Sequence, residues 1–180
     1  MQILETPILN MVGFASLVAT NANRMARAVH PKACIEFGLR RAQGPDGGMS
    51  ASVYSYLGGF SGTSNVRIAE KEAVPCYGTM SHAFITSFGG LEEAPSFTVN
   101  EVDIRQKAVE IRKELGWKTH DGELAAFLAY AKAFPNSFRT LIDTYSTLDS
   151  GILNTIIVGR ALISAGVTDI GLRLDSGDLC

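Results

Sequence analysis

The stretch Pro75-Cys76-Tyr77-Gly78-Thr79-Met80-Ser81-His82 decides the predicted fold. A short run with β character, 74–77, ends at Gly78, and an apolar segment with helical character follows at 83–88. A hydroxyl and an imidazole therefore stand between a strand end and a helix start. In α/β proteins this edge carries the chemistry, because the layers beneath it are packed. The stretch thus predicts an α/β fold with a polar site at a strand end.

Three further segments repeat this pattern of an apolar strand followed by polar groups. Residues 33–37, 138–142 and 167–174 are expected to be strands, and helices are expected between them. Helix starts are expected at Thr6-Pro7, at the capping-box pair Asn100 and Asp103, and at Asp121, and loops are expected at 39–48 and 89–98. Strands that alternate with helices favour parallel βαβ units with right-handed crossovers. The sequence is therefore interpreted as part of a doubly wound sheet or of a closed α/β barrel, with no internal repeat or linker.

Each predicted strand ends in polar groups. Carboxyl ends of parallel strands share one face, so these groups are expected to converge on one pocket. The four clusters are Phe37 with Arg40 and Arg41, Thr79 with His82, Asp143 with Thr144, and Arg173 with Asp175 and Asp178.

The residue types in these clusters suit a phosphorylated sugar. Arginines and glycine-rich turns bind phosphates, while carboxylates bind ribose hydroxyls or Mg²⁺, or stabilise developing positive charge. A histidine can move protons or accept a phosphoryl group. An isolated Asp or Arg is more often a cap or an ion pair, so only the convergence favours a site. His30 and His120 lie beside Pro31 and Asp121 and are interpreted as surface residues.

Composition restricts the class of protein. The 180 residues are 46% apolar and 19% charged, and 16 basic against 18 acidic residues give a net charge of −2. Without a polybasic run, nucleic acid and anionic membranes are poor candidate partners. The apolar run 11–19 is too short to span a bilayer. Three cysteines, two of them in strands expected to be buried, indicate reduced thiols and a cytoplasmic location.

Four segments together resemble the signature segments of nicotinate phosphoribosyltransferase, in order and spacing. They are residues 37–48, 78–82, 143–145 and 173–179. The resemblance implies an irregular parallel α/β barrel of the type II phosphoribosyltransferase kind in a cytoplasmic homodimer. Residues 1–180 would form an incomplete barrel domain from the centre of the family's chain, with the flanking N-terminal and C-terminal parts outside it.

The resemblance also implies a reaction. Nicotinate and 5-phosphoribosyl 1-diphosphate would give nicotinate mononucleotide and diphosphate, with ATP hydrolysis and Mg²⁺ or Mn²⁺, as the first step of NAD synthesis from nicotinate. His82 matches the histidine that family members phosphorylate from ATP. Arg173 matches the arginine that holds the nicotinate carboxylate, with Thr79 beside the ring and Phe37 where the ring can stack.

The remaining site residues are assigned by the same resemblance. Arg40 and Arg41 would face phosphates, and Asp143 and Asp175 would act near the ribose, with Asp175 also near Mg²⁺. The turn after the last strand adds the substrate-binding positions Ser176, Gly177 and Asp178.

Ser64 bears on the choice of substrate. Nicotinamide-using relatives have an aspartate at this position, which would repel a carboxylate, so a neutral Ser64 favours the acid. Two alternatives stay open: a nicotinamide or quinolinate phosphoribosyltransferase, and a truncated, non-catalytic subunit or binding fragment. The 180-residue chain by itself is expected to be inactive.

Overall fold

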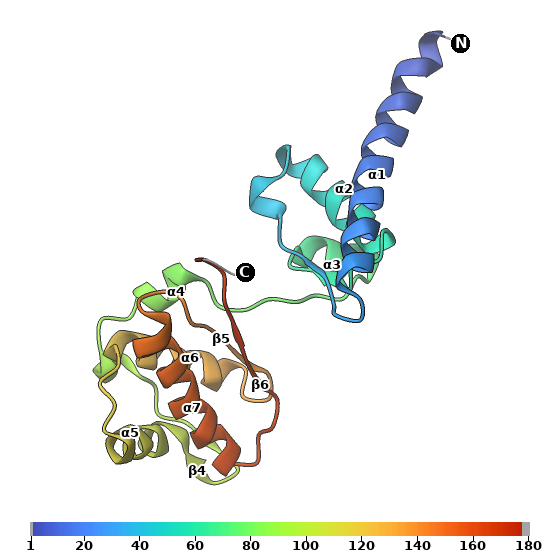
Figure 1. Cartoon of the computed structure of the whole chain (residues 1–180). Helices are drawn as coiled ribbons and strands as arrows, with labels where there is room; N and C mark the ends of the chain where they lie inside the picture. Colours follow the sequence, from blue (N-terminus) through green and yellow to red (C-terminus); the bar gives the residue numbers. More distant parts are fainter. Residues whose placement is uncertain (1, 178–180) are drawn as a thin grey trace. The chain divides into compact units, whose positions relative to one another are not determined.

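The computed structural model describes residues 2–177, which fall into two compact units, 2–78 and 79–177. The division lies inside the stretch 75–82. Each unit is described by itself, with the elements labelled in Figure 1.

The first unit is built on two packed helices. Its elements are α1 (Gln2–Val29), β1 (Ile35–Glu36), the 3-10 helix η1 (Leu39–Arg41), α2 (Gly44–Leu57), β2 (Gly62–Thr63) and α3 (Val66–Glu72). Helix α2 packs on α1, and β1 pairs with β2 in parallel, with Glu36 opposite Thr63. Both short strands end at the same edge of this unit.

Two helix boundaries in this unit differ from the sequence prediction. A helix start at Thr6-Pro7 was expected, but α1 already begins at Gln2, and Pro7 lies inside it. The glycine-rich segment 44–48 was predicted as loop and is the first turn of α2. Pro45 and Asp46 explain this start, because proline suits the first helical turn and an acidic side chain there favours the helix dipole.

The predicted strands of this unit are shorter than expected. Only Ile35–Glu36 of the segment 33–37 is a strand, and the segment 74–77 makes a single parallel bridge, between Cys76 and Thr63. The expectation of buried cysteines is also wrong, because Cys34 is only half-buried and Cys76 is exposed.

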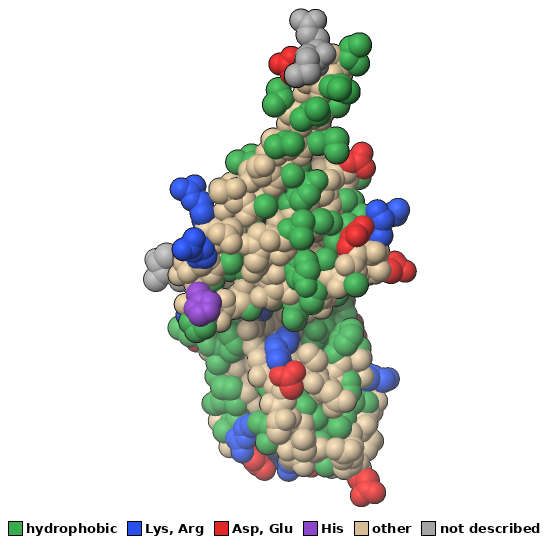
Figure 2. Space-filling view, turned by 90° about the vertical axis from the view of Figure 1, so that its right-hand side faces the viewer, with side chains coloured by type: hydrophobic (Ala, Val, Ile, Leu, Met, Phe, Trp, Pro, Cys, Tyr) green, Lys and Arg blue, Asp and Glu red, His purple; other side chains and the backbone are tan. Residues whose placement is uncertain are grey.

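Helix α1 carries an extended apolar surface (Figure 2). By length and composition alone, residues 3–29 would suffice to cross a membrane, since an 18-residue window within them has a mean hydropathy of 1.4. This is weak evidence, since signal sequences and core helices meet the same criterion. The apolar segment is nevertheless longer than the apolar run 11–19. The absence of a membrane partner stays a prediction.

The second unit contains the main hydrophobic core. Its elements are α4 (His82–Thr86), η2 (Leu91–Glu93), β3 (Thr98–Val99), β4 (Val102–Asp103), α5 (Ile104–Leu115), α6 (Asp121–Ala133), β5 (Phe138–Leu141), the π-helix η3 (Thr147–Gly151), α7 (Ile152–Ser164) and β6 (Ile170–Arg173). Residues 122–128 of α6 are all buried, so this helix lies at the centre. Figure 1 shows α7 running beside it.

Two helix caps in this unit differ from the prediction. Asp103, expected as the acidic partner of an Asn100 cap, is itself the N-cap of α5, and its carboxylate accepts the Gln106 N–H at 2.9 Å. Helix α6 is capped by His120 and not by Asp121: the His120 Nδ1 accepts the Glu123 N–H at 3.2 Å. The predicted loop 89–98 also contains η2 and the start of β3.

The described residues form three separate two-stranded sheets. The pair β5–β6 is parallel over four residues, from Phe138 opposite Ile170 to Leu141 opposite Arg173. The chain is therefore a mixed α/β protein, as predicted, with parallel pairing of its last two expected strands. A closed barrel stays a prediction.

Candidate functional site

The parallel pairing of β5 and β6 positions the candidate site. Because Leu141 is level with Arg173, the two strands deliver Asp143 and Asp175 to the same edge of the sheet. Gly151 packs against the backbone of Ile142, where a side chain would overlap the carbonyl oxygen. This close approach holds the start of α7 against the strand end that carries Asp143.

Asp143 is the centre of the hydrogen-bonded cluster. Its Oδ1 lies 3.2 Å from His82 Nε2, and its Oδ2 accepts the Asp175 N–H at 3.1 Å and the Ser176 hydroxyl. Burial alone would raise the pKa of Asp143, but these hydrogen bonds and the charge of His82 outweigh it and lower the pKa below its usual value. The carboxylate is therefore ionised at neutral pH, with a side chain only 4% exposed.

The ionised Asp143 fixes the tautomer of His82. A carboxylate can only accept, so His82 Nε2 carries a proton, and in the neutral ring Nδ1 therefore carries the lone pair. The imidazole stands at the first turn of α4, which Ser81 caps through the Phe84 N–H, and it is 42% exposed. An oriented and accessible imidazole of this kind can act as a nucleophile.

Arg173 connects strand β6 to the stretch 75–82, which contains Thr79. Its Nη1 donates to Thr79 Oγ1 at 3.0 Å, and its Nη2 is paired with Asp175. The arginine is half-buried. A guanidinium held on two sides in this way offers a fixed geometry for binding a carboxylate or phosphate.

The structure brings together six predicted site residues, all in the second unit: Thr79, His82, Asp143, Arg173, Asp175 and Ser176. Gly177 follows directly, with φ +90°. The predicted residues Phe37, Arg40, Arg41 and Ser64 belong to the first unit, so their part in the same site stays a prediction. Asp178 lies outside the described residues.

Sequence reasoning missed a buried polar cluster beneath this edge. The Glu123 Oε2 accepts from the Ser150 hydroxyl and, at 3.0 Å, from Asn154 Nδ2, and burial raises the pKa of Glu123. His120, whose Nδ1 accepts the Glu123 N–H, also stacks on Tyr145 with ring centroids 3.8 Å apart. The available signal was a single acidic residue directly before the apolar run 124–128.

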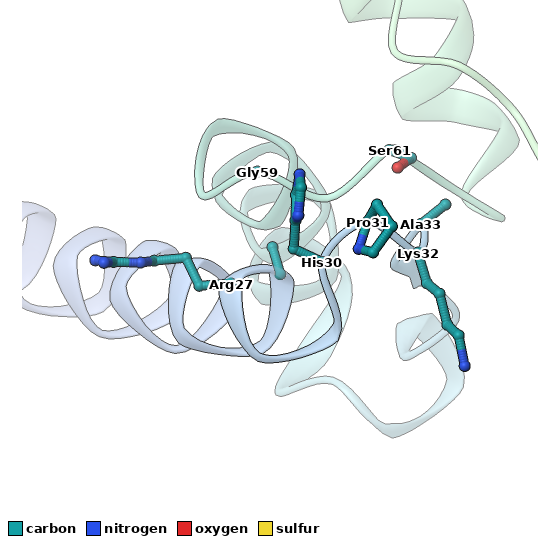
Figure 3. Close-up of a pocket in the computed structure, with 8 residues that line it drawn as sticks. Arg27, His30, Pro31, Lys32, Ala33, Gly59 and Ser61 are labelled. Carbon is teal, nitrogen blue, oxygen red and sulfur yellow. The ribbon is translucent and has the colours of Figure 1, made fainter.

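A cavity lies elsewhere, at the C-terminal end of α1. It has a volume of about 600 Å³ and is lined in part by Arg27, His30, Lys32 and Ser61. Figure 3 shows the Arg27 and Lys32 side chains pointing in different directions, so their charges do not converge on one ligand. His30 and His120 are both exposed, as predicted.

Within the described residues, no group of three His, Cys, Asp or Glu side chains forms a metal site. The carboxylates of Asp143 and Asp175 stand at one edge, and Mg²⁺ commonly takes one or two protein carboxylates together with substrate phosphates. The donor set therefore fits a metal that arrives with a diphosphate, and it does not fit a cage built from protein alone.

Comparison with known proteins shows what the chain is similar to. No family model matches the chain. It is 48% identical over 193 aligned residues to human nicotinate phosphoribosyltransferase, and 49% identical over 185 residues to the Dictyostelium discoideum protein of the same name. The chain is a homologue of one segment of the nicotinate phosphoribosyltransferases. These matches cover 99% of the chain but 36% and 31% of the relatives, so it spans about a third of their length.

A solved structure agrees. The crystal structure of human nicotinic acid phosphoribosyltransferase matches with a TM-score of 0.86 and 47% identity, over 99% of this chain and 39% of that one. The nicotinate phosphoribosyltransferases to which the chain is similar include one from Arabidopsis thaliana at 46% identity. Neither a nicotinamide nor a quinolinate enzyme is favoured by these relatives.

Proposed function

We propose that the protein to which this chain belongs is an ATP-dependent nicotinate phosphoribosyltransferase. It makes nicotinate mononucleotide and diphosphate from nicotinate and 5-phosphoribosyl 1-diphosphate, as the entry of nicotinate into NAD synthesis. The observation that carries this proposal is that His82 and Arg173 belong to one hydrogen-bonded cluster around Asp143. The resemblance assigns ATP coupling to the first residue and nicotinate binding to the second.

His82 takes the phosphoryl group from ATP. The lone pair on Nδ1 attacks the γ-phosphorus, and the bond from phosphorus to the ADP oxygen breaks, with its electron pair leaving on ADP. Asp143 holds Nε2–H throughout and stabilises the positive charge that develops on the ring. The distance of 3.2 Å and the ionised state of Asp143 support this role.

Arg173 binds the nicotinate carboxylate, oriented by Thr79 and Asp175. The ring nitrogen then attacks C1 of the phosphoribosyl group, and the C1–O bond breaks with its electrons leaving on diphosphate. The negative charges of Asp143 and Asp175 favour the oxocarbenium-like transition state. Mg²⁺, or Mn²⁺, supplies charge neutralisation of the diphosphate when bound.

The architecture and setting are part of the same proposal. The parallel pair β5–β6 is taken as two neighbouring strands of an irregular barrel, and the exposed apolar side chains of α1 support burial of that helix in a larger assembly, such as a homodimer. We place this assembly in the cytoplasm.

The proposal is tested by incubating the purified natural protein with labelled nicotinate, 5-phosphoribosyl 1-diphosphate and Mg²⁺, with and without ATP. We expect nicotinate mononucleotide and diphosphate in equal amounts, with more product when ATP is present. Parallel reactions contain nicotinamide or quinolinate. Faster use of either of these, or no product from any of the three, would overturn the proposal.

A further inference from the structure

A carboxylate in the first unit, that of Glu36, has no role in the proposed reaction but makes several hydrogen bonds. Glu36, the last residue of β1, is half-buried, and its Oε2 accepts from Ser52 Oγ at 2.9 Å and from Thr63 Oγ1 at 2.6 Å. Its Oε1 accepts the backbone N–H of Gly38. None of the ion pairs between described residues includes Glu36. The contacts of this carboxylate with described residues are therefore hydrogen bonds and not ion pairs.

The donors are themselves joined into a closed ring. The Asn65 N–H donates to Thr63 Oγ1 at 3.0 Å, and Asn65 Nδ2 donates to Ser52 Oγ at 3.1 Å. The hydrogen bonds thus run from Glu36 to Thr63, on to Asn65 and Ser52, and back to Glu36. The last three residues are at most 2% exposed. Removing one member leaves buried polar atoms without partners, so the ring resists deformation.

The ring fixes two segments at once. The Gly38 contact sets the turn between Phe37 and η1, and η1 carries Arg40 and Arg41. The Ser64 N–H donates to the Glu36 carbonyl oxygen at 2.9 Å, and both neighbours of Ser64 are members of the ring. One carboxylate therefore holds both first-unit segments to which the resemblance assigns substrate contacts.

We propose that Glu36 is a positioning residue for nicotinate recognition, which locks the Phe37–Arg41 segment and the Ser64 turn into one arrangement through its contacts with Gly38, Thr63 and Ser52. This inference rests on the proposed function. Protein side chains that are held in place before the substrate binds do not have to be ordered on binding. We therefore expect loss of Glu36 to act mainly on KM for nicotinate and on discrimination against nicotinamide.

The test uses Glu36→Gln in the natural protein. The new amide keeps one oxygen for Ser52 and Thr63 but turns an NH₂ group toward the Gly38 N–H, so two donors face each other. We expect KM for nicotinate to rise about tenfold and kcat to stay within about twofold, because one hydrogen bond to a charged group is lost. The preference for nicotinate over nicotinamide falls by a similar factor.

Matched variants separate positioning from plain loss of stability. Ser52→Ala removes a ring hydroxyl, whereas Ser55→Ala makes the same change one turn along α2, at a buried serine outside the ring. Thr63→Val removes the hydroxyl and keeps the shape of the side chain, whereas Thr63→Ser keeps the hydroxyl. We expect Ser52→Ala and Thr63→Val to follow Glu36→Gln, and Ser55→Ala and Thr63→Ser to follow the wild type.

A second readout does not depend on activity. Hydrogen exchange of the backbone amides of residues 62–66 is expected to be faster in Glu36→Gln, with exchange in α6 unchanged. An unchanged KM, a fall in kcat that only tracks the folded fraction, or unchanged exchange at 62–66 overturns the inference. If the wild type uses no nicotinate, the proposed function fails, while the exchange measurement still decides whether Glu36 holds the ring.

Discussion

Arg173 donates a hydrogen bond across 94 residues of sequence to the hydroxyl of Thr79, at 3.0 Å. The same guanidinium is paired with Asp175, whose backbone N–H donates to Asp143. Asp143 in turn holds His82. The residue proposed to bind nicotinate and the residue proposed to take a phosphoryl group are thus linked through two neighbouring residues, Asp175 and Asp143.

His82→Ala removes the proposed phosphoryl acceptor. We expect ATP to lose its stimulation of product formation, because no imidazole Nδ1 is left to receive the phosphoryl group, while nicotinate still binds through Arg173. The measurements are product formation with and without ATP, and nicotinate binding by calorimetry. An undiminished stimulation by ATP in the variant would remove His82 from this role.

Asp143→Asn keeps the size of the side chain but loses its charge. Hydrogen bonds to charged groups contribute about 1.5–3 kcal/mol, so we expect ATP-dependent turnover to fall by roughly 10- to 100-fold. Phosphate incorporation into His82, followed with γ-labelled ATP, is expected to fall in parallel. Incorporation at the wild-type rate would show that Asp143 does not orient the imidazole.

The lowered pKa of Asp143 also predicts acid sensitivity. The folded state holds this proton less tightly than the unfolded state, so its stabilisation is present above the ordinary value of 3.8 and disappears as the pH falls through the lowered folded pKa. Urea midpoints of the wild type and Asp143→Asn should therefore converge at the acid end. A constant difference between the two urea midpoints down to the most acidic pH would contradict this prediction.

The opposite sign applies to Glu123, whose pKa burial raises. The folded state binds this proton more tightly, so the contribution to stability is complete below the ordinary value of 4.5. It declines as the pH rises to the raised pKa. Glu123→Gln mimics the neutral acid and keeps an oxygen for Ser150 and Asn154. We expect the urea midpoint of the variant to lack this decline. If the urea midpoint fell equally with rising pH in both proteins, the assignment would be contradicted.

Gly151→Ala tests the contact that supports Asp143. An added Cβ would overlap the backbone of Ile142, and overpacking of this kind costs about 1–3 kcal/mol. We expect a lower melting temperature and weaker phosphorylation of His82. Gly13→Ala is the matched control, since nothing lies within 4 Å of its added Cβ, and helix propensity predicts a gain of about 0.5–1 kcal/mol. Equal effects of both substitutions would show that the Ile142 contact is unimportant.

The features that could be predicted from the sequence are those that depend on a local pattern of residues. Apolar runs followed by acids located β5 and β6 and therefore the Asp143 and Asp175 edge, because parallel strands end together. The two-residue strand β2 was missed, since a strand so short inside a glycine-rich turn has no periodicity. His120 was not expected as a cap because Asp121, the next residue, suits the same position in sequence.

The hydrogen-bonded ring around Glu36 was beyond sequence reasoning for a different reason. Glu36, Ser52 and Thr63 lie 11 to 27 residues apart in sequence, and each is an ordinary polar residue in its own segment. Only the packing of α2 against the β1–β2 pair brings Ser52 and Thr63 to one carboxylate. Likewise, nothing in the composition of α6 distinguishes a buried Glu123 from a solvated one, because the structure around it determines burial.

Ser64→Asp tests the predicted choice of the acid over the amide. A carboxylate at this position would repel the negative charge of nicotinate and would accept a hydrogen bond from the carboxamide of nicotinamide. We expect kcat/KM for nicotinate to fall by about tenfold or more, the size of one unfavourable charge pair near 1.4 kcal/mol, and the ratio of nicotinamide to nicotinate use to rise.

Ser64→Asn, which has a similar size and no charge, is the control for this prediction. It should retain most nicotinate use if charge is the cause, whereas an equal loss in both variants would indicate a steric effect. Unchanged kinetics in Ser64→Asp would place Ser64 outside the nicotinate site. That result would leave the Glu36 ring supporting only the segment that contains Phe37 and the two arginines.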